Sequence, residues 1–199
     1  MIRKMADAKF SRYVMYNAIE DWAANHPILT ATPKDKKEGK VIGGGSQLVQ
    51  LWPKVSWEVT NYPNVDAMNL PWEDASVDIL LSDQMLEHVP KPWKAADEMI
   101  RVLKPGGLLI CTTCFMQRWH PPATYFNFHP DGLKSLFDHN LTTITAGGWG
   151  HRLVNDIFNY NPEEKMWRNL KIHDKPILKD MAEDNDPKSP FSSCILGVK

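Results

Sequence analysis

The sequence predicts an α/β fold built on a mostly parallel sheet, and three features of one stretch carry this prediction. Residues 78–82 (DILLS) and 108–112 (LLICT) are short apolar runs without alternation, as in strands that are covered on both faces. Between them, residues 92–103 repeat apolar side chains at helical spacing, with Trp93 on the apolar side. The segment Pro105-Gly106-Gly107 cannot continue that helix. Together these features predict a βαβ unit with parallel strands and a right-handed crossover.

The overall composition favours one domain in a reducing compartment. At 199 residues the chain is long enough for one core and short for two. Lys and Arg total 23 and Asp and Glu total 24, which is not the charge pattern of a nucleic-acid-binding protein. No apolar run has the length of a membrane span or of a signal-peptide core. With three cysteines, an odd number, we expect no disulfide framework and a cytoplasmic protein without nucleic-acid or membrane partners.

Residues 1–29 are predicted to contain a helix that precedes the first strand. Apolar side chains repeat at helical spacing from Phe10 to Trp22, which predicts a face packed on the sheet. A second interpretation is a lid over a substrate, because the same helix also carries Tyr13 and Tyr16. We favour packing.

A glycine cluster follows the next predicted strand. Val41-Ile42 enters Gly43-Gly44-Gly45-Ser46, and a short helix is expected over residues 48–52. Glycine adopts positive φ readily and lets a ligand approach the backbone, while a helix N-terminus offers unpaired N–H groups. The cluster is therefore a candidate ligand loop, and a flexible loop is the alternative. Residues 57–63 are predicted to form the second strand and its turn.

Four motifs in order carry a resemblance to a known family. They are Asp-Ala-x-x-Leu-Pro at 66–71, Ser-Val-Asp-Ile-Leu-Leu-Ser at 76–82, Leu-Glu-His-Val at 86–89 and Arg-Val-Leu-Lys-Pro-Gly-Gly at 101–107. In this order they resemble the core of class I S-adenosylmethionine-dependent methyltransferases of the small-molecule type, over about the middle half of the chain. The resemblance implies a Rossmann-like, mostly parallel sheet with helices on both faces and an antiparallel last strand.

The spacing of these motifs predicts a departure from the family's usual sheet. Asn61, at the end of the second predicted strand, stands only five residues before Asp66. The helix and third strand that the family usually places there cannot both fit, so we expect a sheet trimmed near its third strand. Asn61 also stands where the family usually has an acidic residue for the ribose hydroxyls, and Val41 stands at another position that is usually acidic.

The resemblance implies S-adenosylmethionine as the cofactor and suggests its contacts. The glycine loop would face the methionine and ribose parts, and Asp66 with the next two backbone units would face the adenine. A turn-forming role for Asp66 is the alternative. Ser82 and Asp83 end a predicted strand, where ligands of parallel sheets bind. The expected cofactor contacts are Gly43, Gly44, Gly45, Asn61, Asp66, Ala67, Met68, Ser82 and Asp83.

The candidates for acceptor chemistry lie after two strands. Asp83 is the first candidate for a polar group near the methyl donor, with capping of the next turn as the alternative. Residues 114–130 form an aromatic loop whose histidines could bind or deprotonate an acceptor, or could simply be packed. The predicted catalytic residues are Asp83, His120 and His129, and the predicted substrate contacts are Trp119, Tyr125 and His88.

The remaining segments complete one predicted domain. Zinc is not expected, because Cys111 and Cys114, three apart on a strand, point to opposite faces unless the strand ends between them. The single methyltransferase-like domain, 1–199, is predicted to have its core at 39–146, a polar insertion or partner surface at 155–190 and an antiparallel closing strand at 191–198.

These patterns favour methyl transfer from S-adenosylmethionine to an O or N nucleophile of a small molecule by in-line displacement. The alternative is a catalytically degenerate methyltransferase-like protein that acts as a binding or regulatory partner, which the non-acidic Val41 and Asn61 favour. A nicotinamide-dependent oxidoreductase is less consistent with the motifs, since the ribose carboxylate is missing. A homo- or hetero-oligomer is compatible with the Trp-rich composition.

Overall fold

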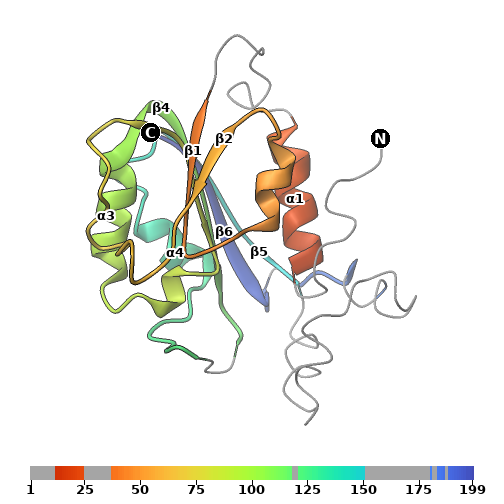
Figure 1. Cartoon of the computed structure of the whole chain (residues 1–199). Helices are drawn as coiled ribbons and strands as arrows, with labels where there is room; N and C mark the ends of the chain where they lie inside the picture. Colours follow the sequence, from red (N-terminus) through yellow and green to blue (C-terminus); the bar gives the residue numbers. More distant parts are fainter. Residues whose placement is uncertain (1–11, 25–36, 118–120, 151–179, 181–182, 187) are drawn as a thin grey trace.

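The computed structural model describes residues 12–24, 37–117, 121–150, 180, 183–186 and 188–199 (Figure 1). These residues form a six-stranded sheet with the strand order β2-β1-β3-β4-β6-β5. The strands are β1 (Glu38–Ile42), β2 (Ser56–Val59), β3 (Val77–Asp83), β4 (Leu103–Cys114), β5 (Thr143–Trp149) and β6 (Ser192–Val198).

The sheet has the mixed character that the motifs predicted. Strands β1, β2, β3 and β4 pair in parallel, whereas β6 is antiparallel to both β4 and β5. Gly39 lies opposite Ile79 across the β1–β3 pair, and Cys111 lies opposite Ile195 across the β4–β6 pair. The predicted closing strand at 191–198 therefore lies between β4 and β5, and the prediction of an antiparallel last strand is confirmed.

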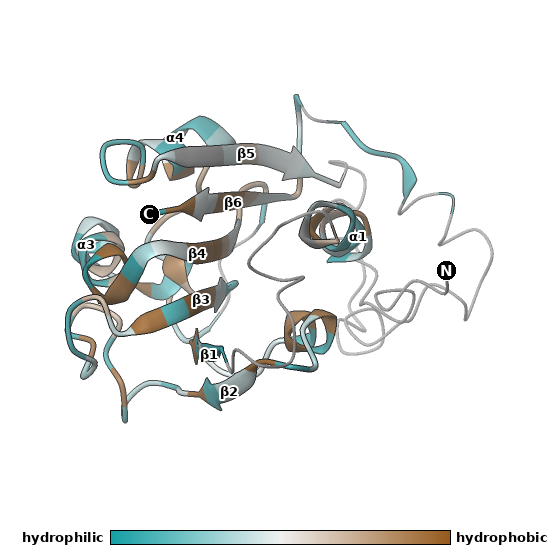
Figure 2. Ribbon diagram, turned by 90° about the horizontal axis from the view of Figure 1, so that it is seen from above, coloured by the Kyte–Doolittle hydropathy of each residue, from teal (hydrophilic) through white to brown (hydrophobic). Residues whose placement is uncertain are grey.

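Helices cover both faces of the sheet, as expected (Figure 2). On one face, α1 (Tyr13–Ala23) and the 3₁₀ helix η3 (Gln47–Leu51) pack on the sheet, and on the other face lie α3 (Pro92–Val102) and α4 (Pro130–Ser135). Each face has its own apolar cluster. Under α1 and η3 are Met15, Ile19, Leu48, Ile79, Leu81 and Ile110, and under α3 and α4 are Leu80, Met99, Leu103, Leu109, Leu133 and Phe137.

The predicted βαβ unit is confirmed as β3, α3 and β4, with one difference in packing. Helix α3 begins with Pro92 in its first turn and buries Ala95, Ala96 and Met99. Trp93, which the apolar periodicity placed on the core face, is 51% exposed. Its ring instead makes an edge contact with Phe126 of a neighbouring loop, at a centroid distance of 6.5 Å. The buried face of α3 is therefore centred on Ala95, Ala96 and Met99, and Trp93 lies outside it.

The sheet is trimmed where the motif spacing predicted. Strand β2 forms one edge, and residues 60–76, which are all described, contain turns and only an isolated bridge between Asp66 and Asn69. The chain thus returns from the carboxyl end of β2 to the start of β3 without an intervening helix or named strand. Most of the predicted insertion at 155–190, together with Phe10, lies outside the described residues. Among the described residues no helix is long and apolar enough to cross a bilayer.

Candidate functional site

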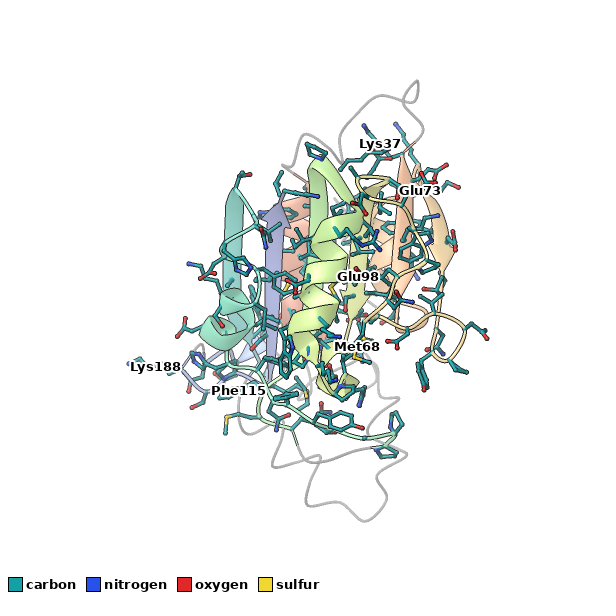
Figure 3. The ribbon with its side chains drawn as sticks, turned by 90° about the vertical axis from the view of Figure 1, so that its left-hand side faces the viewer. Lys37, Met68, Glu73, Glu98, Phe115 and Lys188 are labelled. Carbon is teal, nitrogen blue, oxygen red and sulfur yellow. The ribbon has the colours of Figure 1, made fainter. Side chains whose placement is uncertain are left out.

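The candidate site lies at the carboxyl ends of the parallel strands. Strand β1 is flanked by β2 on one side and by β3 on the other, so the chain reverses its winding direction between β1 and β3. Ligands of open α/β sheets bind in the crevice at such a reversal. Met68 and Phe115 lie at this end of the sheet, and Lys37 lies at the opposite end (Figure 3).

The glycine cluster forms a tight turn directly after β1. Gly43 has φ +91° and Gly44 has φ +103°, a conformation that favours glycine over residues with a side chain. A Cβ atom on Gly43 would lie 2.4 Å from Met85 Cγ, whereas one on Gly45 would meet no atom within 4 Å. The Gly44 N–H donates to the Thr60 carbonyl at 2.9 Å, which ties the turn to the end of β2. The expectation of positive φ is confirmed at Gly43 and Gly44.

A pocket of about 650 Å³ opens beside this turn. The pocket brings together seven of the predicted site residues: Gly43, Asn61, Asp66, Ala67, Met68, His88 and Tyr125. The lining residues are Ile42, Gly43, Asn61, Tyr62, Val65, Asp66, Ala67, Met68, Gln84, Met85, His88, Val89, Pro90, Pro122, Ala123 and Tyr125.

Asp66 lies on the pocket wall and also shapes that wall. Its Oδ1 accepts a hydrogen bond from the Met68 N–H at 2.8 Å, and its carbonyl accepts one from the Asn69 N–H at 3.0 Å. The side chain therefore makes the turn that sequence reasoning offered as the alternative. A carboxylate has room for several hydrogen bonds, so this turn leaves acceptor capacity on the side chain.

Asp83 has a different place from the one expected of a group beside the methyl donor. Its side chain is 3% exposed and does not line the pocket. One carboxylate oxygen accepts hydrogen bonds from the Ser46 hydroxyl at 2.7 Å and from the Tyr16 hydroxyl, and the other accepts from the Thr112 hydroxyl at 2.6 Å. A guanidinium nitrogen of Arg12 lies 3.5 Å away. Asp83 thereby connects the glycine turn, α1 and β4.

Burial and the Asp83 charge together shift the pKa values of Arg12 and Tyr16, the two residues that reach this cluster from the start of α1. Burial and the neighbouring Asp83 charge raise the pKa of the Tyr16 phenol well above its usual value, so the phenol stays a hydrogen-bond donor. For Arg12, burial by itself would lower the pKa, but the charge of Asp83 raises it above its ordinary value. The sequence pattern missed both residues. The available signal was a polar pair four residues apart next to the buried Met15 and Ile19.

Gln84 is a pocket residue that sequence reasoning did not select. It has φ +54°, which is uncommon for a residue with a side chain, and its backbone N–H donates to the Thr112 carbonyl at 2.9 Å. Its side-chain amide reaches the Thr112 hydroxyl at 3.2 Å. This turn after β3 places Asp83 in the buried cluster and Gln84 on the pocket wall. Ser82, which directly precedes Asp83, is fully buried and does not line the pocket.

The aromatic loop is anchored over the pocket by backbone bonds. The Tyr125 N–H donates to the Glu87 carbonyl at 2.8 Å, and His88 Nδ1 pairs with the Ala123 carbonyl. Because a carbonyl only accepts, Nδ1 carries the proton and Nε2 is the basic nitrogen of the neutral ring. His129 lies outside the pocket lining, where its Nδ1 accepts from the Asp131 N–H at 3.3 Å and caps α4. Trp119 and His120 lie outside the described residues.

The cysteines are buried thiols in the centre of the sheet. Burial raises the pKa of Cys111 to about 12 and raises those of Cys114 and Cys194 above the usual range. All three are free. Within the described ranges, no cluster of three or more His, Cys, Asp or Glu side chains could hold a metal ion.

The trimmed sheet, the glycine turn after β1 and the pocket at the winding reversal define a Rossmann-like α/β protein with its candidate site at that reversal. Residues 46–111 match the family model of a methyltransferase domain. This match covers less than half of the chain; together with the fold around it, it makes the chain similar to the class I S-adenosylmethionine-dependent methyltransferases.

The chain is similar to known proteins over different shares of their length. An uncharacterized methyltransferase of Mycobacterium tuberculosis is 51% identical over 147 residues, covering 62% of this chain and 56% of the relative's length. The chain spans about half or less of the length of the curated relatives it matches. An S-adenosylmethionine-dependent methyltransferase from Archaeoglobus fulgidus superposes with TM-score 0.57, 12% identity and 95% coverage of both chains.

A second solved structure is that of Haemonchus contortus phosphoethanolamine N-methyltransferase 2 in complex with phosphomonomethylethanolamine and S-adenosylhomocysteine. It superposes with TM-score 0.55 and 15% identity, covering 94% of this chain and 53% of that one. At this identity the likeness establishes the fold.

Proposed function

We propose that the chain binds S-adenosylmethionine in the pocket beside Gly43 and promotes transfer of its methyl group to a small-molecule acceptor. The observation that carries the proposal is the convergence of the Gly43–Gly44 turn, Asn61 and Asp66 on one pocket. The three come from separate segments and match the positions that the family uses for the methionine, ribose and adenine parts of the cofactor.

The residues present fit that cofactor. The positive-φ turn has no Cβ atoms, so a ligand can approach its backbone closely. The Asn61 amide can accept a ribose hydroxyl, although without the charge assistance of a carboxylate. Asp66 keeps acceptor capacity for an exocyclic amino group, and the Ala67 and Met68 side chains offer an apolar wall.

When bound, S-adenosylmethionine supplies a methyl group on a sulfonium, already activated for in-line displacement by an acceptor nucleophile. The chain's own residues bind the cofactor, orient the acceptor and exclude water from the pocket. Met85, Val89 and Pro122 make the lining apolar, and Tyr125 and His88 are the described side chains that we assign to the acceptor. Where the acceptor must lose a proton, His88 Nε2 is the basic nitrogen we assign to receive it.

In this proposal Asp83 is a positioning residue. Its carboxylate holds the Ser46 hydroxyl, and Ser46 ends the glycine turn and caps η3 by accepting from the Leu48 N–H at 3.1 Å. Loss of Asp83 would release the turn from β3. The predictions that His120, His129 and Trp119 serve the acceptor remain predictions for the complete site.

The test is calorimetric titration of the folded chain with S-adenosylmethionine and, separately, with S-adenosylhomocysteine. We expect saturable binding of both, and a loss of at least about tenfold in affinity in Gly43→Ala, because the new Cβ would collide with Met85 in a strained conformation. Gly45→Ala is the matched control, since its Cβ has open space, and it should bind within about twofold of the parent.

The variant Asp66→Asn separates the two roles of this side chain. Asparagine can still accept the Met68 N–H and keep the turn, but it replaces a charged acceptor by an amide. We expect unchanged stability and a loss of roughly tenfold in cofactor affinity. If the folded parent chain bound neither ligand, the enzyme assignment would be wrong and the binding-partner alternative would take its place.

A further inference from the structure

Exposed aromatic side chains of the described residues lie on or next to the segments that line the pocket. Of the large apolar side chains that are exposed in the described residues, four are aromatic: Tyr62 at 74%, Tyr125 at 55%, Trp93 at 51% and Phe126 at 37%. Tyr62 and Tyr125 line the pocket itself. Scattered exposed apolar residues need no explanation, but a contiguous patch beside a pocket marks a ligand surface.

Next to the pocket-lining segments lie three aromatic rings, of which Phe126 contacts the other two. Tyr125 lines the pocket, and Phe126 follows it in the chain. The Phe126 ring lies 5.8 Å from that of Phe128, which is buried, and 6.5 Å from that of Trp93 on the first turn of α3. We call the surface formed by Tyr125, Phe126 and Trp93 the aromatic ledge.

The ledge is held in place by the backbone beneath it. The Phe128 N–H donates to the Cys114 carbonyl at 3.0 Å, and the Ser193 hydroxyl donates to the Phe128 carbonyl at 2.6 Å. The Tyr125 N–H is held by Glu87. An apolar surface that is ordered before binding costs a ligand little conformational entropy. Helix α3 buries Ala95, Ala96 and Met99 against the core, whereas its Trp93 side chain is exposed and forms part of the ledge.

We propose that the methyl acceptor is amphiphilic: its nucleophilic head enters the pocket and its extended apolar tail lies on the aromatic ledge. The inference rests on the proposed methyl transfer, which is what makes the bound molecule an acceptor. Two segments connect the ledge to the pocket: Tyr125 of the lining precedes Phe126, and Pro90 of the lining lies three residues before Trp93. This proximity argues for an occupant with a head in the pocket and a tail long enough to reach Phe126 and Trp93.

The experiment measures binding of a series of 4-alkylphenols, from 4-ethylphenol to 4-octylphenol, to the chain saturated with S-adenosylhomocysteine. Each added methylene that reaches apolar surface should tighten binding by up to about fourfold. We expect an overall gain of at least about tenfold along the series. In Trp93→Ala/Phe126→Ala the affinity should stop rising with tail length, while 4-ethylphenol should bind as it does to the parent.

Two controls keep the result specific to the ledge. Trp93→Phe/Phe126→Leu retains apolar area and should restore most of the dependence on tail length. Val59→Ser removes an exposed apolar side chain on the β2 edge and should leave the dependence unchanged. Both variants should bind S-adenosylhomocysteine like the parent.

A parent chain that binds S-adenosylhomocysteine but shows no dependence on tail length overturns the inference and leaves the proposed function standing. The inference is also overturned if the ledge variants abolish instead a dimer detected by light scattering or binding to phosphatidylcholine vesicles. Absence of S-adenosylhomocysteine binding, with the tail dependence intact, overturns the proposed function and leaves an amphiphile-binding surface.

Discussion

Asp83 is a buried carboxylate whose bonding partners come from three separate parts of the chain. Tyr16, which donates to it, is 67 positions away in sequence, and Thr112 is 29 positions away. Periodicity places Asp83 correctly at the end of β3, because strand ends follow from apolar runs and their polar boundaries. It cannot predict the partners, since these depend on how α1 docks. The sequence therefore predicted a polar group at the end of β3, and the structure adds the hydrogen-bond partners that hold it there.

We predict that Asp83→Asn destabilises the chain by about 2–3 kcal/mol, because charge-assisted bonds to the hydroxyls of Ser46 and Thr112 are weakened and Arg12 loses its counterion. Urea unfolding followed by circular dichroism measures this. The exposed Asp138 provides the control, and Asp138→Asn should change stability by less than about 0.5 kcal/mol. Equal stability of Asp83→Asn and the parent would show that the cluster does not connect α1 to the sheet.

At the scale of elements, α3 holds the segment that leads out of the pocket wall. Arg101 donates to both Glu98 oxygens at 2.7 Å and to the carbonyl oxygens of Trp72 at 2.9 Å and Leu70 at 3.0 Å. Glu98 in turn accepts the Leu70 N–H at 2.8 Å. Residues 70–72 follow the Asp66 turn directly, so this pair connects the helix to the pocket wall.

This pair predicts an acid-dependent loss of stability. The hydrogen bonds from Arg101 lower the pKa of Glu98 below its ordinary value of 4.5, so the stabilisation is complete above that value and is lost as the pH falls through the lower folded-state pKa. We expect Glu98→Gln to cost about 1–2 kcal/mol in urea unfolding at pH 7 and progressively less below pH of about 4. The neighbouring exposed Asp97 supplies the control, Asp97→Asn. A cost that is independent of pH would refute the ionic contribution.

The elements themselves were predictable to the extent that local rules govern them. Pro92 lies in the first turn of α3 as expected, because proline acts through its own backbone. The helix ends at Val102, however, and the segment Pro105-Gly106-Gly107 that was expected to stop it lies within β4. The orientation of Trp93 was not predictable, since the helical period defines a broad apolar arc and tertiary contacts choose its centre. Phe126, the contact that holds Trp93 outward, belongs to a loop without periodicity.

At the scale of the whole molecule, the trimmed sheet was predictable from the short spacing between two motifs, whereas the pocket was not. Asp66 comes only five positions after Asn61, and so short a segment cannot contain a helix and a strand; this arithmetic needs no tertiary information. The pocket depends on Gln84 turning at positive φ, which neither periodicity nor composition indicates in a residue with a side chain.

The three cysteines on β4 and β6 give a measure of opening of the entire sheet. All are buried, and burial raises their pKa values, that of Cys111 to about 12, so the native thiols are poor nucleophiles at pH 8. Side chains of a strand point out of the sheet faces, and Cys111 lies in the cluster under α3 and α4 whereas Cys194 lies in the cluster under α1 and η3. Reaction of both thiols with a reagent then requires opening of the layers on both faces of the sheet. We predict rates at least about a thousandfold below those in urea for all three thiols, measured by absorbance of the released product.

Cofactor binding should slow the same reaction if opening of the sheet destroys the pocket. With S-adenosylhomocysteine at about one hundred times its Kd, the open population falls about a hundredfold, and the thiol rates should fall equally. Gly43→Ala is the control, since it should fold but gain little protection. If one thiol reacted rapidly in the native chain, or if the ligand protected only some of them, β4 and β6 would open separately from the pocket, and the sheet would not behave as one cooperative unit.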